Sequence, residues 1–255
     1  MPPFKSLKKP SLSKEVEKQL RQSISAKIYR QGDKLPSERE LVDQFEVSRA
    51  TVRDALKNLQ NLGLISIKRG GNAGAYVSEP TPHPITQSID NLIQMGKVNF
   101  AHLIEIRLYI EPDVAMGAAI HRTSADINTL TELLDSAEVY VDISRKKARL
   151  TNVRFHCEVA KIMQNALISF FCESITQVYS SMIIEMTHER LEKSAILKLI
   201  SEHRIILEAI INKNPKEAFQ RTKTHLIETY YTYSKIIPNS YDANIDKRIN
   251  YFAKL

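Results

Sequence analysis

The sequence predicts a mainly α fold: an N-terminal winged helix-turn-helix domain, which is a small α+β unit, followed by an all-α antiparallel bundle of six or seven helices. Three observations predict it. Residues 32–77 contain two short helical patterns separated by a tight turn, and then a basic, glycine-rich hairpin pattern. Residues 85–236 are periodic at helical spacing in nearly every window, with only short breaks. Residues 78–84 hold three prolines and predict a stiff linker between the two domains.

The first domain, residues 1–77, begins with a stretch rich in proline and lysine. Residues 1–13 show no periodicity, so we expect them to be extended or disordered. Apolar residues then recur every fourth position from Ser13 to Tyr29 and predict the first helix. These residues are Val16, Leu20, Ile24 and Ile28.

The helix-turn-helix is predicted by two capping residues. Ser37 is followed three residues later by Glu40, which is the spacing of a capping box, and the helix it starts should end near Glu46. Ser48 can then cap a second helix almost immediately. In that second helix Arg49 and Arg53 lie one turn apart, beside an inward apolar stripe. The stripe comprises Val52, Ala55, Leu56 and Leu59.

A hairpin is predicted after this helix. Two short β-prone runs, Leu64–Ile67 and Ala75–Val77, flank the basic and glycine-rich residues 68–71. Such a tip is suited to lie along a phosphate backbone or in a minor groove. Helix, helix and hairpin in this order make a winged helix.

The run LPSERELVDQFEVSRATVRDALKNLQNLGLISIKRG resembles the DNA-binding domain of the GntR family of bacterial transcription regulators. The resemblance implies a double-stranded DNA operator as partner. It also implies six contact residues: Arg39, Arg49, Thr51 and Arg53, with Arg69 and Gly70 at the wing. The alternative is that the arginines are ordinary solvated surface charge, although the second helix of this motif is where major-groove readout occurs.

Charge and cysteine content agree with a nucleic-acid partner and a reducing compartment. Up to Pro80 there are 15 Lys and Arg residues against 9 Asp and Glu residues, so this part carries +6 of the total charge of +7. The two cysteines, Cys157 and Cys172, form neither a metal-binding pair nor a disulfide framework and are expected to be buried. No signal peptide or membrane-spanning run is evident, so we expect a cytoplasmic protein without membrane contact.

The helical bundle contains two features that stand out from its general periodicity. Pro112 falls inside the second predicted helix, which it should kink. Residues 166–186 are apolar on more than one face, which predicts burial in the bundle or partly against a second subunit. Residues 237–255 form a C-terminal tail in which we find no clear period.

Polar residues occur on apolar stripes of three bundle helices. Asn152 and His156 share a helical face, and His203 and His225 lie on two later helices. Each histidine alone is more often a hydrogen-bonded core residue than a ligand. Three inward imidazoles on neighbouring helices can instead converge on a divalent ion.

The order of these residues is similar to the ligand-sensing FCD domain of the FadR-like branch of GntR regulators. That resemblance implies a divalent metal ion (zinc, nickel or manganese) held by Asn152, His156, His203 and His225. It also implies a small organic acid as effector, with Arg107 as an effector-binding residue in the pattern Glu105, Arg107, Glu111. Asn152 stands where the family has an acidic ligand, so an ion here would be held less tightly and keep one more unit of positive charge. The alternative for Arg107 is an intrahelical ion pair with Glu111.

The sequence therefore predicts a ligand-controlled transcription regulator, with repression as the commoner mode in the family. We expect a homodimer on a two-fold symmetric operator and no enzymatic activity. Two alternatives remain open at this stage. One is a metal-dependent, hydrolase-like enzyme built on the histidines, and the other is a constitutive DNA-binding protein with a purely structural bundle.

Overall fold

The computed structural model describes residues 11–79, 81–187, 191–237 and 242–254. It divides the chain into two compact units, Met1–Pro84 and Ile85–Leu255, and each is described by itself below. The expected extended arm lies almost wholly outside the described residues, as do Pro80 of the expected linker and Tyr241 of the tail.

The N-terminal unit contains three helices around one apolar cluster. They are α1 (Leu12–Ser25), α2 (Glu38–Phe45) and α3 (Arg49–Asn61). Val16 and Leu20 of α1 are buried in the cluster as expected, but Ile28 is 68% exposed. The prediction that the helix continues to Tyr29 is wrong, because Lys27 adopts a left-handed φ of 58° and the helix has already ended.

Both predicted helix caps are present. The Ser37 hydroxyl accepts a hydrogen bond from the backbone N–H of Glu40, while the Glu40 carboxylate accepts one from the backbone N–H of Ser37. Glu46 ends α2 in the left-handed conformation with φ of 53°. The Ser48 hydroxyl then caps α3 by accepting from the backbone N–H of Thr51. The caps thus fix the start of both helices of the motif.

The hairpin forms the wing. Strands β1 (Ile65–Lys68) and β2 (Gly74–Val77) pair in antiparallel register, with Ile65 opposite Val77. Their inward residues join the same core as α1 and α3. Gly70 has a φ of 89°, a conformation that a residue with a Cβ rarely adopts, so the tip of the wing depends on glycine. The winged helix-turn-helix is confirmed.

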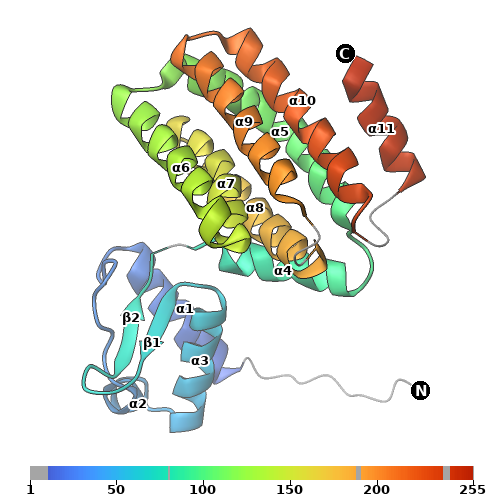
Figure 1. The fold of residues 1–255 in the computed structure, drawn as a ribbon. Helices are drawn as coiled ribbons and strands as arrows, with labels where there is room; N and C mark the ends of the chain where they lie inside the picture. Colours follow the sequence, from blue (N-terminus) through green and yellow to red (C-terminus); the bar gives the residue numbers. More distant parts are fainter. Residues whose placement is uncertain (1–10, 80, 188–190, 238–241, 255) are drawn as a thin grey trace, which may run out of the picture. The chain divides into compact units, whose positions relative to one another are not determined.

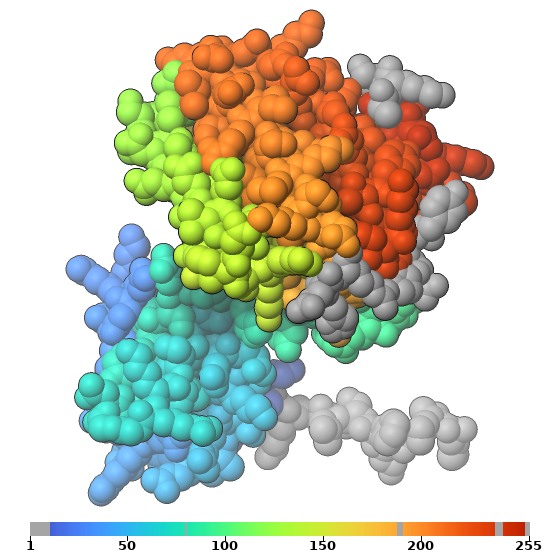
Figure 2. Space-filling view, in the orientation of Figure 1, coloured from blue at the N-terminus to red at the C-terminus, as the bar shows by residue number. Residues whose placement is uncertain are grey.

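The second unit is an all-α bundle, as predicted, and Figure 1 shows its long helices running side by side. Helix α5 is central and packs against five others, which are α7, α8, α9, α10 and α11. On the face visible in Figure 2, side chains of α6, α9 and α10 close over the interior. The helices up to residue 234 are α4 (His83–Gln94), α5 (Phe100–His121), α6 (Ser124–Ile143), α7 (Arg145–Ile162), α8 (Ala166–Thr187), α9 (Lys193–Ile211) and α10 (Pro215–Ser234).

One of two notable proline residues lies differently from the expectation. The linker was expected to extend through residue 84, but α4 starts at His83 and contains Pro84 in its first turn. A proline is tolerated there because the first N–H groups of a helix have no intrahelical acceptor. Pro112 lies inside α5, as predicted.

The C-terminal tail contains an eighth bundle helix, which the sequence analysis missed. This helix, α11 (Ala243–Lys254), buries Ile245 and Ile249 in the main core. An ion pair between Arg248 and Glu105 attaches it to α5. Ile245, Ile249 and Phe252 recur at i, i+4 and i+7, so a short apolar stripe was present in the sequence, and the structure shows that it packs against the main core beside α5.

Helix α8 is the most apolar of the bundle. Among the described residues it is the one helix that is long and apolar enough, by length and composition, to cross a membrane. The expectation that no such run exists was therefore too strict. In the bundle α8 packs on α7 and α5 and buries Val178, Tyr179 and Ile183, while 39% of its most apolar window is buried, so a core position explains part of its composition.

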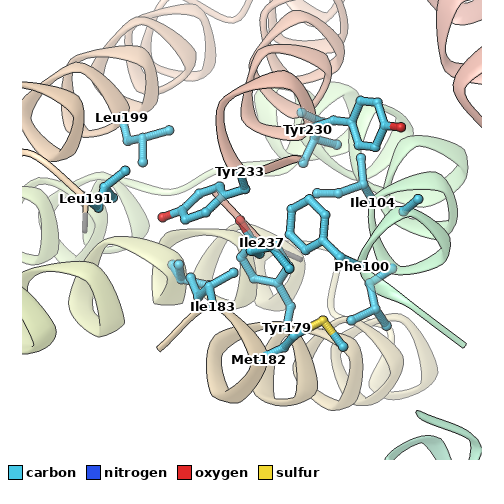
Figure 3. Close-up of a cluster of buried hydrophobic side chains, with 14 of the residues drawn as sticks. Phe100, Ile104, Tyr179, Met182, Ile183, Leu191, Leu199, Tyr230, Tyr233 and Ile237 are labelled. Atoms are coloured by element: carbon cyan, nitrogen blue, oxygen red, sulfur yellow. The ribbon is translucent and has the colours of Figure 1, made fainter. Parts of the chain in front are cut away.

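Aromatic residues fill one end of the core. Figure 3 shows the Phe100 ring beside Tyr179 and Tyr230, with Tyr233 nearby. The ring centroid of Phe100 lies 5.8 Å from that of Tyr179 and 5.9 Å from that of Tyr233. Tyr179 and Tyr233 also line the cavity described next, so this aromatic cluster forms one wall of the candidate site.

Candidate functional site

Three histidines meet in the middle of the bundle. His156 of α7, His203 of α9 and His225 of α10 are all buried, and one nitrogen of each lies within 4.8 Å of those of the other two. The Nε2 atom of His203 is 3.0 Å from Nε2 of His156 and 3.0 Å from Nε2 of His225. The structure thus brings together, from three helices, the histidines that the sequence analysis selected.

The opposite ring nitrogen of each histidine faces an oxygen atom. Nδ1 of His156 lies 2.8 Å from the Glu111 carboxylate, and Nδ1 of His225 lies 2.7 Å from the Glu202 carboxylate. Nδ1 of His203 lies 2.8 Å from Oδ1 of Asn152. An oxygen acceptor places the ring hydrogen on Nδ1, so each Nε2 presents a lone pair to the centre.

The electrostatic environment keeps His156 and His203 neutral. Burial acts to raise the pKa of Glu111, but Arg107 and His156 outweigh it and lower that pKa to about 2, so the carboxylate is ionised. Burial lowers the pKa of His156 to about 4. The pKa of His203 lies well below its usual value, mainly because of burial and, to a smaller extent, because of the two neighbouring histidines. Neutral imidazole is the form that binds a metal.

This donor set fits a divalent transition metal. Three buried lone pairs pointing at one another repel unless a cation or a proton lies among them, and the low pKa values disfavour the proton. An oxygen acceptor on the far nitrogen is also the arrangement that orients metal-binding histidines. Asn152 contacts the far side of His203, so in this structure its amide oxygen holds a histidine in place and is not the fourth donor at the centre.

Arg107 is 1% exposed and lies beside the histidines. Its Nε donates to Glu111 at 2.6 Å, so the intrahelical ion pair considered for it is present. Its guanidinium carbon also lies 4.4 Å from the ring centroid of Tyr179. Arg107 nevertheless lines the same cavity as the histidines, which has a volume of about 20 Å³. The position of Arg107 is therefore compatible both with the ion pair to Glu111 and with contact to an effector in the cavity.

The sequence analysis did not assign Glu202, Arg149 or Thr229 to this site, and it named Glu111 only beside Arg107. Glu111 and Glu202 orient His156 and His225, Arg149 lines the cavity from α7, and Thr229 lines it from α10. Arg149 precedes Asn152 by three residues, so helical spacing could have placed it on the same face. Nothing in the sequence pairs Glu202 with His225, because they belong to different helices.

The expected DNA-contact residues lie on α2, α3 and the wing. Arg39, Arg49 and Arg53 are exposed, and so are Arg69 and Gly70 at the tip of the hairpin. Thr51 is partly buried, and its hydroxyl lies 2.8 Å from the hydroxyl of Ser48, so it already takes part in capping α3. These positions leave the basic side chains accessible to a partner.

Arg53 has one intramolecular partner. Its Nε lies 3.5 Å from the Glu38 carboxylate, and both side chains are substantially exposed, at 68% and 41%. An exposed pair of this kind is weak and screened by salt. A phosphate or base edge can therefore replace Glu38 at little cost.

Both units match known families. Residues 12–77 match the family described as bacterial regulatory proteins, gntR family, and residues 102–228 match the FCD domain. The chain is 33% identical over 217 residues to the Uxu operon regulator of Haemophilus influenzae, covering 81% of this chain and 76% of that protein. It is 30% identical over 225 residues to the transcriptional repressor NanR of Salmonella schwarzengrund, covering 86% and 83%.

A solved structure is also similar. The Streptococcus agalactiae GntR structure has a TM-score of 0.62 and 26% sequence identity, and the match covers 85% of this chain and 98% of that one. Together with the named relatives, it indicates that the two units described above occur in the same order in other regulators.

Proposed function

Since the chain belongs to the GntR family of bacterial transcription regulators and carries an FCD domain, we propose that its operator binding is controlled by a small organic acid at the three-histidine centre. That the protein is a DNA-binding transcription regulator follows from the family. The relatives are regulators and not enzymes, which disfavours the hydrolase-like alternative. The remaining question is how the bundle acts on the DNA-binding unit.

The observation that carries the proposal is the convergence of three Nε2 lone pairs whose Nδ1 atoms are held by Glu111, Asn152 and Glu202. We propose that a divalent ion of the zinc, nickel or manganese kind binds there through His156, His203 and His225. Such an ion would supply an open coordination position for a carboxylate oxygen. If the bundle were purely structural, as in the alternative of a constitutive DNA-binding protein, there would be no reason for three oriented histidines in its core.

The charges around the centre favour an anion as the effector. The three imidazole ligands bring no charge, Arg107 offsets the charge of Glu111, and Glu202 offsets one unit of a divalent ion, so a net positive charge remains. A divalent ion in this buried place would keep much of its charge, which is expensive in a medium of low dielectric constant. We propose that a carboxylate of the effector neutralises it and that Arg107 turns part of its guanidinium from Glu111 to the same ligand.

Calorimetric titration of monocarboxylic and dicarboxylic acids tests whether the effector is a carboxylate bound at the metal. Zinc-loaded wild-type protein should bind acids, and a His203→Ala variant should not. Equal binding to both proteins, or a preference for neutral or cationic ligands, would contradict a metal–carboxylate site. The winged-helix assignment would stand in either case.

We propose repression as the mode of action and the cytoplasm, where operators are accessible, as the location. A relative of 30% identity is named a transcriptional repressor. Exposed basic side chains on α2, α3 and the wing support contact with DNA through Arg39, Arg49 and Arg53 and through Arg69 and Gly70 at the wing, with the partly buried Thr51 beside them.

Removing a basic side chain from α3 should weaken operator binding. Arg49→Ala or Arg53→Ala should lose roughly 1 to 3 kcal/mol, the usual contribution of a base-edge or phosphate contact. Gel-shift titration at fixed salt measures this loss, with Lys18→Ala, exposed on α1, as a comparison. Thermal unfolding should stay unchanged, since Arg49 and Arg53 are exposed. Wild-type affinity in both variants would exclude them from the interface.

A further inference from the structure

A second cavity, of about 730 Å³, lies at the start of α7. Arg145 and Lys146, both exposed, contribute from the first turn of this helix, and Lys193 contributes from the first turn of α9. Asp142 is the one acidic residue among its described lining residues, and it pairs with Lys193. With Arg149 the lining carries four basic side chains against one acidic side chain. This outer cavity therefore attracts anions.

Arg149 connects the outer cavity with the histidine cavity. It is the only described residue that lines both of them, and it is 3% exposed. Its Nη2 donates to the carbonyl oxygen of Ile183 at 2.7 Å and to the hydroxyl of Thr187 at 2.6 Å. These bonds fix the guanidinium to α8, so a charged group is held at the boundary between the two spaces.

The inner cavity is too small to hold an effector by itself. Its volume of about 20 Å³ suits roughly one water molecule, whereas ligand sites usually have about 300 to 1,000 Å³. The outer cavity lies within that range. The inner wall also contains the hydroxyl of Thr229, which is buried and has no hydrogen-bond partner among the described residues. A buried polar atom of this kind indicates that a polar group from a ligand or a water belongs there.

We propose that the outer cavity is the entrance and second anion subsite of the effector site. The inference rests on the metal–carboxylate function proposed above and extends it. One acidic group of the effector reaches past Arg149 to the histidine centre. The body of the effector and a second acidic group stay outside, where Arg145, Lys146 and Lys193 hold them. The effector is accordingly an organic acid with at least two anionic groups.

The test compares acids that differ only in the second charge. Straight-chain diacids of four to six carbons are titrated into zinc-loaded, full-length protein, each beside the monocarboxylic acid of the same length. The variant is Arg145→Glu/Lys146→Glu, in which the new carboxylates lie at a helix N-terminus, where acidic residues stabilise a helix. The matched control is Lys213→Glu/Lys216→Glu, just before α10 and in its first turn, which makes the same change in net charge, and neither residue lines the outer cavity.

Wild-type protein should bind the best diacid roughly ten-fold more tightly than its monoacid, as three basic groups around one carboxylate allow. The Arg145→Glu/Lys146→Glu variant should bring that ratio close to one and leave zinc affinity unchanged. The control should keep the wild-type ratio. A ratio near one in the wild type at every chain length would overturn the inference, and so would a ratio that the cavity variant does not change.

Failure of the underlying function gives a different result. If zinc-loaded protein binds no acid, or binds acids equally well after His203→Ala, then the metal–carboxylate function is wrong and this inference fails with it. If acids bind in a zinc-dependent way but the outer charges have no effect, only the outer subsite is wrong.

Discussion

His203 illustrates how much of the centre depends on single residues. Its ring stacks on Phe155 with centroids 4.6 Å apart, its Nδ1 is fixed by Asn152, and its Nε2 faces both other histidines. The aromatic contact and the amide together allow one ring orientation. The position of the Nε2 lone pair is thus determined before any ion binds, which lowers the entropy cost of binding.

Removing a carboxylate behind a histidine should weaken metal binding. In Glu202→Ala the Nδ1 of His225 loses its acceptor, so we expect zinc affinity to fall roughly 10- to 100-fold. Competition with a chromogenic chelator measures it. Glu217→Ala is the control, since Glu217 lies on the same helix as His225 and pairs with Arg221, away from the centre. Equal zinc affinity in the two variants would mean that Glu202 does not orient His225.

The metal-free protein should lose stability in acid because of His156. Its pKa is about 4 in the folded state and about 6.5 when unfolded, so the unfolded chain binds the proton more tightly. The stability it contributes is fully present above pH 6.5 and is lost as the pH falls through 4. The loss amounts to about 3 kcal/mol. Denaturant unfolding of wild type and His156→Gln, both with chelator, should show their difference in unfolding free energy shrinking over this range. A constant difference would contradict it.

At the scale of elements, α7 is the helix on which the two cavities depend. Its first turn lines the outer cavity, Arg149 lies one turn further along, and Asn152 and His156 follow at helical spacing toward the centre. One helix therefore presents a row of polar residues from the surface to the core. Such a row on an otherwise apolar helix requires partners from α5, α8 and α9, which supply Glu111, the Ile183 carbonyl and His203.

Helix α11 should contribute measurably to the stability of the bundle. Ile249 is fully buried, so Ile249→Ala should cost about 2 to 5 kcal/mol by removing apolar contacts and leaving a cavity. Tyr251→Ala on the same helix is the control, because Tyr251 is 63% exposed. Thermal unfolding followed by circular dichroism distinguishes them. Equal melting temperatures for the two variants would mean that α11 does not dock on α5 in solution.

At the scale of the whole molecule, the chain combines a basic DNA-binding unit with a bundle that holds the candidate effector site. A single winged helix buries too little surface to select an operator alone, and two symmetric half-sites double the contact. The bundle also leaves apolar side chains exposed, among them Val139 and Ile143 of α6 and Leu167 and Phe171 of α8. Exposed apolar groups of this size are common where subunits meet.

We therefore predict a homodimer in solution. Sedimentation equilibrium at micromolar concentration should give twice the chain mass of 29.1 kDa. Addition of operator DNA should give one dimer for each two-fold symmetric site. Monomer alone, both with and without DNA, would contradict the prediction and require another source of operator selectivity.

The sequence by itself determined the elements whose signals are local. Ser37 with Glu40, and Ser48, fixed the starts of α2 and α3, because a cap and its helix lie within four residues of each other. The glycine-rich tip fixed the hairpin, and helical periodicity fixed the all-α character of the second unit. The three histidines were also identifiable, since each lies on or directly beside an apolar stripe where a polar residue needs an explanation.

Only the tertiary structure decided what depends on contacts between distant segments. Glu202 became the partner of His225, Arg149 came to lie between two cavities, and Asn152 turned to the far side of His203. The place where helix α11 docks was also decided there, because its apolar stripe packs on the main core and Arg248 pairs with Glu105 of α5. Each of these depends on how separate helices are rotated and aligned when they pack, and side-chain spacing within one helix carries no information about that.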